Sequence, residues 1–391
     1  MNRKKIVHFI LDDKFIIPEM NIYDSLKEYD NEYILIKNLP FQHRVYLKEK
    51  ERVREMSRWS VKKKISRSDY TDIIILHSLF SLPLDLFKFI HPSVKVVWLA
   101  WGYDLYHGKY GMEPLIKIPS LYGVYTNKYV ESQENQFKSS FLIKSRMREL
   151  ISQMLWPATT SLMNDVLQRI DYFGGYPGEY ELIQRNDYFR AENVDYSYPL
   201  IFNLYSKNNV GSFSYNIVGN ILIGNSATET NNHIDIFAKI RKFVSSDKKI
   251  IVPLSYGSSN YREYVISKGH EFFAKQFEPL VDFMPLAEYQ SLIQGCSVAI
   301  FGHERQQAVG NVIMALWNGA KVFLSQDSLV YKYLKSIGLV VFSIQRDLNE
   351  REINTFLSKD EIMDNRRIVS DNFSNEAVLA KVEVMLKKAL S

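Results

Sequence analysis

Residues 221–233 read ILIGNSATETNNH, in which three apolar residues lead into small and polar ones before a helix-like segment begins. The apolar run is typical of a strand buried on both faces, which is the pattern of parallel sheets. Gly224 allows a positive φ or a close approach to the backbone. A strand, a small polar loop and a helix start, in this order, present backbone N–H groups to an anion such as phosphate. An ordinary capped loop between a strand and a helix fits the same letters.

Two further loops follow apolar runs in the same half of the chain. Residues 300–312 read IFGHERQQAVGNV and crowd polar side chains between a strand and a helix. We expect Arg305 to pair with a diphosphate, Gln307 or Glu304 to bind ribose or sugar hydroxyls, and Gly310 to let a group approach the backbone. A surface cluster of ion pairs is the alternative. Residues 251–261 read IVPLSYGSSNY, where Tyr256 either stacks on a base or sugar or packs in a simple turn.

Two candidate bases lie in the first half. Residues 96–106 read VVWLAWGYDLY, so that aromatic side chains surround one carboxylate after an apolar run. Asp104 is the candidate general base, and a role as a helix N-cap or loop aspartate is the alternative. His77 ends the apolar run 73–76 and is the second candidate, although a single histidine at a strand end is more often structural.

Apolar runs alternate with helix-like segments along the whole chain, which predicts an α/β fold with parallel sheets. The length of 391 residues favours two domains. We expect a first domain over 1–200, a boundary within 195–214, a second domain over 215–375, and a C-terminal helix over 376–391 that packs back on the first domain. The expected strands are Lys5–Leu11, Tyr33–Ile36, Ile73–Leu76, Val94–Ala100, Tyr122–Thr126, Asn216–Ile223, Lys249–Leu254, Ser297–Phe301, Lys321–Leu324 and Leu339–Ser343. The expected helices include Leu84–Ile90, Asn232–Val244 and Asn375–Leu390, and Asp171–Tyr180 is expected to be a loop.

Charge and cysteine content restrict the cellular setting. The net charge is +5, and basic residues gather between Arg44 and Arg67, either as a solvated face or as a surface for anionic lipid. The single cysteine, Cys296, lies in an apolar run and predicts a buried thiol and a reducing compartment. No stretch reaches the length of a membrane-spanning helix, and no metal-binding spacing, P-loop or nucleophile elbow is present. We therefore expect a cytoplasmic protein that contacts the membrane from its surface.

Four motifs, taken in chain order, resemble those of one known family. They are Trp101-Gly102-Tyr103-Asp104-Leu105-Tyr106, Gly224-Asn225-Ser226, Val252-Pro253-Leu254-Ser255-Tyr256 and Arg305-Gln306-Gln307-Ala308-Val309-Gly310. They resemble the Trp-Gly-x-Asp-Leu-Tyr, Gly-Asn-Ser, Val-Pro-x-x-Tyr and Arg-Gln-Gln-x-x-Gly motifs of the 4-acetamido-4,6-dideoxygalactosyltransferases. These TDP-Fuc4NAc:lipid II transferases, also called 4-α-L-fucosyltransferases, form glycosyltransferase family 56. The chain departs from the family pattern at His303-Glu304 and at Asn311, which leaves the donor sugar open.

The resemblance implies a GT-B fold of two Rossmann-like domains facing across a cleft. It also implies a dTDP-sugar donor, a polyprenyl-diphosphate-linked glycan acceptor, inversion at the anomeric carbon, and work at the inner face of the bacterial inner membrane, as in enterobacterial common antigen assembly. We expect neither a metal nor a cofactor nor a nucleic-acid partner. The expected catalytic residue is Asp104 or His77, and the expected donor-binding residues are Gly224, Asn225, Ser226, Tyr256, Arg305, Gln307, Gly310 and Asn311.

Three alternatives stay open. The donor is a UDP- or GDP-sugar, the protein binds a nucleotide or glycan without catalysis, or it is another sugar-nucleotide enzyme such as an epimerase. The segment 136–156 is basic and amphipathic, which suits either a helix on a membrane surface or a core helix.

Overall fold

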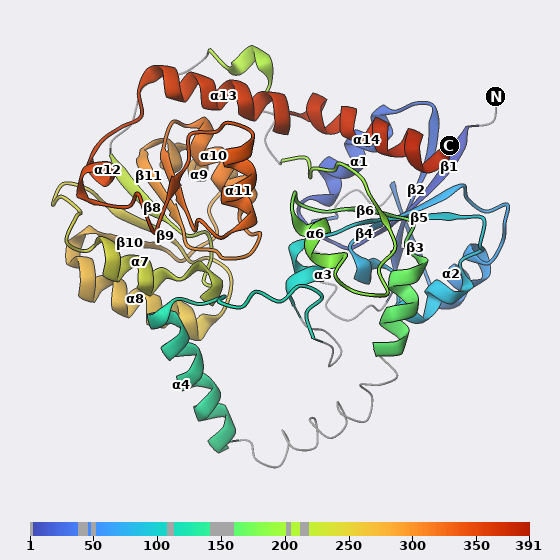
Figure 1. Cartoon of the computed structure of the whole chain (residues 1–391), viewed down its shortest axis with the longest axis horizontal. Coiled ribbons are helices and arrows are strands. Elements are labelled where there is room, and N and C mark those ends of the chain that lie inside the picture. Colours follow the sequence, from blue (N-terminus) through green and yellow to red (C-terminus); the bar gives the residue numbers. More distant parts are fainter. Residues whose placement is uncertain are drawn as a thin grey trace. The chain divides into compact units, whose positions relative to one another are not determined.

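The computed structural model describes residues 3–37, 46–47, 52–107, 113–140, 160–200, 205–211 and 219–391, with the backbone alone for 136–140. The chain divides into two compact units (Figure 1). The first unit comprises Met1–Lys117, Arg146–Asn203 and Phe373–Ser391, and the second comprises Ile118–Ser145 and Leu204–Asn372. The change of unit near residue 204 falls inside the interval 195–214. The segment 118–145, which we assigned to the first domain, instead belongs to the second unit.

The first unit is built on a parallel sheet of seven strands in the order β3-β2-β1-β4-β5-β6-β7. Its strands are β1 (Lys4–Ile10), β2 (Tyr29–Ile36), β3 (Val53–Met56), β4 (Ile73–His77), β5 (Lys95–Leu99), β6 (Tyr172–Gly174) and β7 (Glu192–Asn193). Its helices are α1 (Ile16–Ser25), α2 (Arg58–Ile65), α3 (Gly102–Tyr106), α6 (Glu179–Ile183), α14 (Asn375–Leu390), a helix over 160–169, and the short 3-10 helices η2 (Leu79–Ser81) and η3 (Leu84–Phe89).

The second unit has a parallel sheet of six strands in the order β10-β9-β8-β11-β12-β13. Its strands are β8 (Asn220–Ile223), β9 (Ile250–Pro253), β10 (Phe277–Leu280), β11 (Cys296–Phe301), β12 (Lys321–Leu324) and β13 (Phe342–Ser343). Its helices are α4 (Val124–Ser140), α7 (His233–Ile240), α8 (Ser259–Phe273), α9 (Leu286–Gln294), α10 (Val309–Trp317), α11 (Leu329–Ser336), α12 (Glu350–Asn354) and α13 (Lys359–Phe373). The short 3-10 helices are η4 (Lys207–Asn209), η5 (Glu229–Asn231) and η6 (Ala274–Gln276).

Both sheets follow one connection rule. Counted from its own first strand, each sheet contains the order 3-2-1-4-5-6 of the Rossmann fold, and the first sheet adds β7 as a seventh strand after β6. The central strands are apolar throughout, and every residue of β4 and β11 is buried because helices cover both faces. Helices α7 and α8 cover one face of the second sheet, and α10 and α11 cover the other (Figure 1). The predicted α/β class with two Rossmann-like domains is confirmed.

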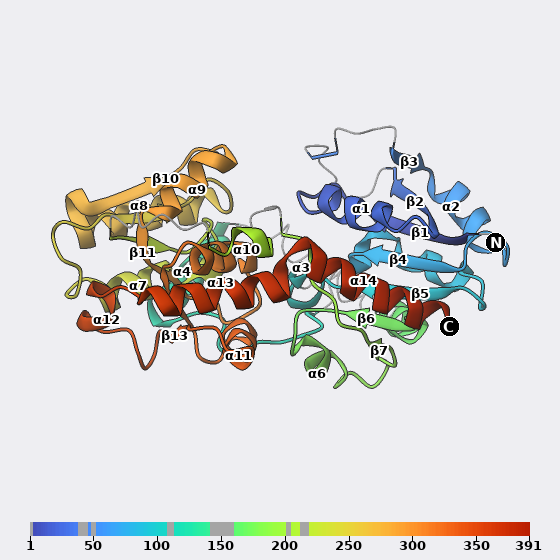
Figure 2. The same ribbon diagram turned by 90° about the horizontal axis from the view of Figure 1, so that it is seen from above.

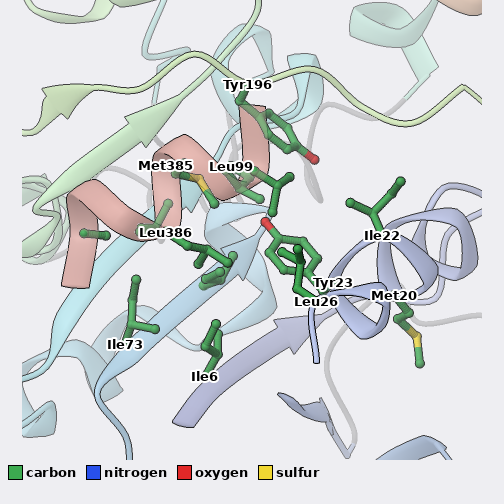
Figure 3. Packing of buried hydrophobic residues seen from close by; sticks show 14 of the residues in the cluster. Ile6, Met20, Ile22, Tyr23, Leu26, Ile73, Leu99, Tyr196, Met385 and Leu386 are labelled. Atoms are coloured by element: carbon green, nitrogen blue, oxygen red, sulfur yellow. The ribbon is translucent and has the colours of Figure 1, made fainter. Parts of the chain in front are cut away.

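The C-terminal helix α14 completes the core of the first unit. Its residues Val378, Val382 and Leu386 are buried against Ile6 and Leu99, among others, from the sheet (Figure 3). These positions recur every four residues along α14, so they form one apolar stripe. The expectation that this helix packs on the N-terminal domain agrees with that arrangement.

A second core lies under α7 and α8. It is formed by Ile223, Val252, Phe237 and Tyr261, among other residues of β8, β9, α7 and α8. Tyr129 of α4 packs on it, with its ring 4.5 Å from that of Tyr264. Helix α4 is therefore part of the second unit, although the chain reaches it directly from the first.

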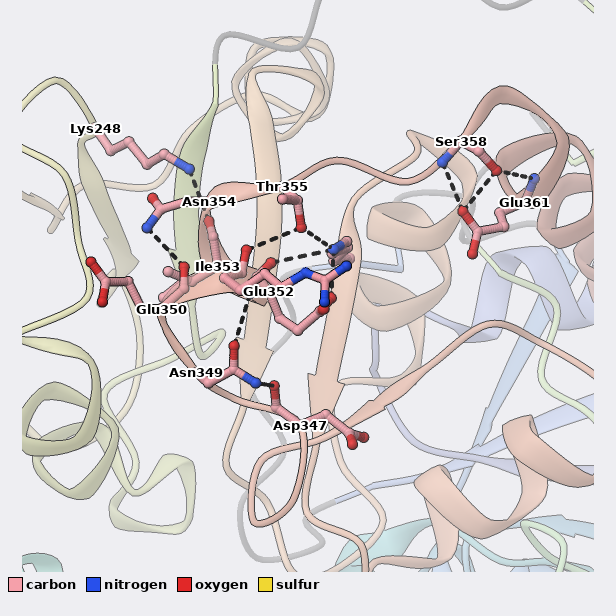
Figure 4. Close-up of polar contacts among 12 residues, drawn as sticks. Lys248, Asp347, Asn349, Glu350, Glu352, Ile353, Asn354, Thr355, Ser358 and Glu361 are labelled. Atoms are coloured by element: carbon pink, nitrogen blue, oxygen red, sulfur yellow. Dashed lines mark hydrogen bonds and ion pairs between the residues drawn. The ribbon is translucent and has the colours of Figure 1, made fainter.

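A polar cluster fixes the amino edge of the second sheet (Figure 4). Lys321, the first residue of β12, donates to Glu352 Oε2 (2.7 Å) and to Thr355 Oγ1 (2.6 Å). Lys248, just before β9, donates to the carbonyl oxygen of Ile353 (2.9 Å). Each buried ammonium group has an oxygen partner, so this edge holds α12 in place.

Most of the expected elements are present, with three differences. Residues Tyr122–Thr126 are not a strand, because α4 begins at Val124. Gly174 ends strand β6, within the segment Asp171–Tyr180 that we expected to be a loop. Leu84–Phe89 is a 3-10 helix. Residues 216–218 of the expected strand before Gly224 lie outside the described residues.

Candidate active site

The loops proposed to bind the donor follow neighbouring strands of the second sheet. The chain moves outward from β8 through β9 to β10 on one side, and from β11 through β12 to β13 on the other. Between such diverging connections, an open parallel sheet leaves a crevice at the carboxyl ends of its strands. The loops that begin at Gly224 and Gly302 lie on either side of this point, and the loop after β9 lies one strand further out. The topology therefore brings the three motif loops to one edge.

Asn231, which is fully buried, joins the loop after β8 to the loop after β11. Its Oδ1 accepts hydrogen bonds from Asn225 N (3.0 Å) and His303 Nε2 (2.7 Å). Its Nδ2 lies 2.8–3.2 Å from four oxygen atoms of Ser226 and Thr228. A single amide thus fixes the path of the loop and connects it to the strand-end loop after β11.

Gly224 is required by the packing of its own loop. Its φ is +69°, and a Cβ there would lie 2.6 Å from His233 Nε2 and 2.8 Å from Asn231 Oδ1. Both the positive φ and the close approach inferred from the sequence are present. The approaching groups are the protein's own side chains.

Asn225 is the point where all three loops meet. Its Nδ2 donates to the Tyr256 hydroxyl (2.7 Å), and its Oδ1 accepts from Gln307 Nε2 (3.3 Å). The Ala227 amide donates to the Tyr256 carbonyl (2.7 Å), which ties the same two loops together through the backbone. The Tyr256 side chain is 48% exposed, so its ring is open to a planar partner.

Hydroxyl groups extend this network. Ser226 Oγ and Thr228 Oγ1 are 3.0 Å apart, and Thr230 Oγ1 donates to Gln307 Oε1 (2.7 Å). Gln307 Nε2 also lies 3.3 Å from Thr228 Oγ1. These partners hold the side chains before any ligand arrives, which reduces the entropy lost on binding.

The start of α10 lies in the loop after β11, and its geometry suits an anion. Its N-cap residue, Ala308, has a φ of +56° and gives the helix no side-chain cap. Backbone N–H groups of such a first turn, where Gly310 lies, carry the positive end of the helix dipole. Arg305 is partly exposed in the same loop, with Nη1 3.2 Å from the Gln306 carbonyl. Asn311 accepts a hydrogen bond from the Tyr289 hydroxyl (3.0 Å), which ties α10 to α9.

Two buried imidazoles lie beneath these loops in the neutral form. Burial lowers the pKa of His233 to about 3. Burial, and after it the charge of Arg305, lowers the pKa of His303 well below its usual value. Arg305 supplies a positive charge to this edge. Glu304 turns to the next strand, where its Oε2 accepts from Ser325 Oγ (2.8 Å), so Gln307 is better placed than Glu304 for ribose or sugar hydroxyls.

The segment before α4 lies against these loops. Asn232 Oδ1 accepts from Gly123 N (2.9 Å), and its Nδ2 donates to the Gly302 carbonyl (2.7 Å). The Asp235 carboxylate accepts from the amides of Tyr125 (2.8 Å) and Thr126 (3.0 Å). The sequence offers no local signal for these contacts, because the partners are more than a hundred residues apart.

Asp104, the first candidate base, is enclosed within the first unit. Its carboxylate accepts four hydrogen bonds, from Ser78 Oγ (2.6 Å), Leu79 N (3.0 Å), Trp98 Nε1 (3.1 Å) and Trp101 N (3.2 Å). Burial raises its pKa, and these donors oppose the shift. With the side chain 1% exposed and both oxygens occupied, the geometry favours the alternative, in which Asp104 caps α3 and joins the loops after β4 and β5.

His77, the second candidate, is part of a buried chain of side chains. Its Nε2 lies 3.0 Å from His8 Nδ1, and His8 Nε2 lies 3.1 Å from Asn31 Oδ1. Asn31 Nδ2 donates to the Tyr23 carbonyl, so its Oδ1 faces His8 as an acceptor.

The tautomers of both imidazoles follow from this chain. Burial lowers the pKa of His8 to about 4, so His8 is neutral, with its proton on Nε2. His77 then donates from Nε2, and its bare Nδ1 lies 3.6 Å from Glu19 Oε2. Burial raises the pKa of Glu19 well above its usual value, which favours the protonated carboxyl. His77 is fully buried, and its placement favours a structural role.

Some of our expectations concern residues or groups that the structure does not place at the site. Residues 141–156 of the proposed lipid-contacting segment lie outside the described residues. Among the described residues, no group of three or more His, Cys, Asp or Glu side chains is placed to hold a metal ion. No described helix combines the length and apolar character needed to cross a bilayer. Cys296 is buried as expected, and burial raises the pKa of its thiol to about 12.

Comparison with known structures shows the fold. The chain is similar to a glycosyltransferase from Rickettsia africae, with 13% identity, a TM-score of 0.62 and full coverage of both chains. It is also similar to Anabaena HepE in complex with UDP and glucose, with 11% identity, a TM-score of 0.59, and coverage of 99% of this chain and 100% of that one. A third similar structure is a UDP-forming alpha,alpha-trehalose-phosphate synthase from Burkholderia xenovorans in complex with glucose-6-phosphate, with 10% identity, a TM-score of 0.58 and full coverage of both chains. The shared fold is GT-B.

Comparison with protein families identifies the second half of the chain. Residues 204–387 match the family described as 4-alpha-L-fucosyltransferase, glycosyl transferase group 56. This match contains three of the four motifs on which the resemblance rests, namely those at Gly224, Val252 and Arg305. The chain is therefore a glycosyltransferase of the GT-B fold, and its residues 204–387 match the group 56 family of 4-alpha-L-fucosyltransferases.

Proposed function

We propose that the protein transfers a sugar similar to 4-acetamido-4,6-dideoxygalactose from a dTDP donor to a polyprenyl-diphosphate-linked glycan, with inversion at the anomeric carbon. The observation that carries the proposal is the hydrogen-bonded edge of the second sheet, where three family motifs meet at Asn225. The group 56 match supports transfer of a fucose-type sugar, and the dTDP donor and the lipid-linked acceptor follow from the resemblance of the motifs.

The loop after β11 supplies partners for the donor diphosphate. Arg305 pairs with its oxygens, and the uncapped first turn of α10 adds N–H donors around Gly310. Negative charge grows on the diphosphate as its bond to the anomeric carbon breaks, so these groups stabilise the leaving group in place of a metal ion. Tyr256 stacks on the base or sugar, while Asn225, Ser226, Gln307 and Asn311 offer amide and hydroxyl groups to the ribose and the sugar.

Helix α2 provides a surface for a membrane that carries the lipid-linked acceptor. Trp59 is 70% exposed, and the exposed Lys62 and Lys63 lie three and four residues further along the same face. Lys63 Nζ is 5.6 Å from the centre of the Trp59 ring, and Lys62 Nζ is 3.9 Å from that of Phe89. A tryptophan among lysines suits the headgroup region of an anionic bilayer. Figure 2 shows α2 beside β3, the edge strand of its sheet.

A thermal-shift comparison of dTDP, UDP and GDP tests the donor site. We expect dTDP to raise the melting temperature of the protein and the Arg305→Ala variant to lose most of this rise. Arg241→Ala, which removes an exposed arginine of the same unit, is the matched control and keeps it. A larger shift with UDP or GDP would mean that the donor carries that nucleotide instead of dTDP. Equal shifts for both variants would mean that Arg305 does not bind the nucleotide.

A transfer assay tests the reaction. The protein is incubated with dTDP-linked 4-acetamido-4,6-dideoxygalactose and a synthetic polyprenyl-diphosphate-linked disaccharide, with and without EDTA. We expect a trisaccharide product with inverted anomeric configuration, formed equally in both conditions. Nucleotide binding without turnover would indicate a binding protein, and a rearranged nucleotide sugar would indicate an epimerase. Loss of activity in EDTA would contradict the metal-independent mechanism.

A further inference from the structure

We propose that the acceptor binds at the carboxyl edge of the first sheet, and that the Asp13 carboxylate takes the proton from its attacking hydroxyl. This inference rests on the proposed transferase function. It replaces Asp104 and His77 with a residue from the turn after β1.

The position of Asp13 follows from the strand order. In the first sheet, β1 and β4 are neighbours, and the connections diverge from them through β2 to β3 and through β5 to β6. The crevice of an open parallel sheet opens at this point, outside the carboxyl ends of the strands. Asp13 lies three residues after the end of β1 and three residues before the start of α1. It therefore stands at the same topological position as the donor loop after β8 in the second sheet.

Asp13 and its neighbour Asp12 are partly exposed, unlike four other acidic and imidazole groups of the first unit. Asp104, His77, Glu19 and Glu179 are each at most 1% exposed. Asp12 is partly exposed, but its Oδ1 accepts hydrogen bonds from the amides of Tyr46 (3.1 Å) and Leu47 (2.8 Å) and so holds a loop. Asp13 is partly exposed as well, and its Oδ1 accepts a hydrogen bond from Phe15 N (3.0 Å).

Backbone donors orient the carboxylate: Phe15 N holds Oδ1 at the start of α1, and the Lys14 backbone also hydrogen-bonds to the group. A carboxylate has about four lone-pair sites, so it can accept from an acceptor hydroxyl as well. Phe15 and Tyr198 lie beside it, with ring centres 6.0 Å apart, and Trp101 lies 6.1 Å beyond Tyr198. All three rings are partly exposed. Flat apolar faces next to a carboxylate suit a sugar ring, whose C–H face packs on aromatic groups while its hydroxyls reach a polar partner.

The environment of Asp13 also suits proton transfer. Burial raises its pKa, while the Phe15 amide and the charge of Lys14 oppose the shift and the charge of Asp12 adds to it. The Tyr198 hydroxyl, which donates to the Ala100 carbonyl, stays protonated because burial raises its pKa. A carboxylate with a raised pKa is a stronger proton acceptor.

The step is balanced in atoms and charge. An oxygen lone pair of the acceptor hydroxyl forms the new bond to the anomeric carbon, and the hydroxyl proton passes to Asp13 Oδ2. The bond from the anomeric carbon to the diphosphate oxygen breaks, and its electron pair leaves with the dTDP. The Asp13 proton is then released to solvent.

Asp13→Asn tests the inference, with Asp12→Asn as the matched control in the same turn. The assay uses dTDP-linked 4-acetamido-4,6-dideoxygalactose and the synthetic polyprenyl-diphosphate-linked disaccharide. We expect kcat to fall by about a hundred-fold to ten-thousand-fold in Asp13→Asn, the range typical of a lost general base, with the dTDP-induced thermal shift unchanged. Asp12→Asn should retain kcat within about ten-fold, because it keeps a hydrogen-bonding oxygen for the loop. Equal losses in both variants would contradict the inference.

Two further measurements separate proton transfer from a structural effect. The wild-type kcat/KM should fall toward acid pH, because the base must be ionised, and Asp13→Asn should lack this acid limb. Formate should restore part of the turnover of Asp13→Ala, because it supplies a small carboxylate in the vacated space. A wild-type protein that neither binds dTDP nor turns over would refute the proposed function itself. A wild-type protein that turns over alongside a fully active Asp13→Asn would refute only the assignment of Asp13.

Discussion

At the scale of single residues, the candidate site depends on Asn231, which lies outside all four motifs. Its amide joins Asn225 to His303. The N-cap of α7 is the next residue, Asn232, which has a φ of +53°. The motifs predicted that three loops of the second half form the donor site. The motifs could not predict that the Asn231 side chain holds these loops together, because its partner His303 lies 72 residues after it in the chain.

Replacing Asn231 should uncouple the loops. Asn231→Ala leaves the Asn225 amide and His303 Nε2 without their acceptor, so we expect stability to fall by about 1–3 kcal/mol and dTDP affinity to fall with it. Asn365→Ala is the matched control, since Asn365 is equally buried but bonds to Val340. It should destabilise the protein while leaving dTDP affinity unchanged. Denaturant unfolding and calorimetric titration measure both effects, and unchanged affinity in Asn231→Ala would speak against its role.

Glu19 makes the stability of the protein dependent on pH. Its folded-state pKa lies well above the ordinary value of 4.5 because of burial. The folded protein thus keeps a proton that the unfolded chain has lost, and Glu19 contributes less stability as the pH rises from about 4.5 through the raised pKa. Glu19→Gln imitates the neutral acid and does not titrate.

The variant should therefore gain on the wild type at higher pH. We expect the melting temperature of Glu19→Gln, relative to wild type, to be higher at about pH 8 than at about pH 5. Glu181→Gln, at an exposed position of the same unit, should follow the wild type at both pH values. A constant difference between Glu19→Gln and wild type would mean that Glu19 is already ionised in the folded protein.

At the scale of elements, the sequence predicted long buried strands well and short or tertiary-dependent elements poorly. β12 has the predicted bounds, because its apolar run is continuous. β6 has three residues and ends at Gly174, so no run was visible. β10 carries Pro279, which a strand tolerates at the sheet edge where β10 lies. Residues Tyr122–Thr126 have strand-like letters, but Asp235 caps the amides of Tyr125 and Thr126 and starts α4 instead.

Helix α2 gives a prediction at this scale. Lys63→Glu reverses one charge beside Trp59, and each basic residue near an anionic surface contributes about 1 kcal/mol. We expect binding to phosphatidylglycerol-containing vesicles, measured by co-sedimentation, to weaken about ten-fold. Lys242→Glu makes the same charge change at an exposed site of the second unit and should have little effect. Equal weakening in both variants would indicate attraction by net charge alone.

At the scale of the whole molecule, the chain does not follow the simple division into an N-terminal and a C-terminal half. The first unit is assembled from three stretches of chain, and the second from two. The alternation of strands and helices predicted two Rossmann-like domains correctly. Segment 118–145 could not be assigned from its letters, because its partners are Asn232 and Asp235 of the second unit.

The C-terminal helix should therefore stabilise the N-terminal sheet. Leu386 of α14 is fully buried, whereas Val384 on the same helix is 66% exposed. We expect Leu386→Ala to lower stability by about 2–5 kcal/mol and Val384→Ala by less than about 0.5 kcal/mol. Similar effects in thermal unfolding would contradict the role of α14 in the core.

Hydrogen exchange with and without dTDP tests the donor site most directly. We expect dTDP to slow amide exchange in residues 224–231, 256–258 and 302–312 of the second unit, with little change at the amino edge around Lys321 and Glu352. Protection elsewhere with none in these three loops would contradict the account.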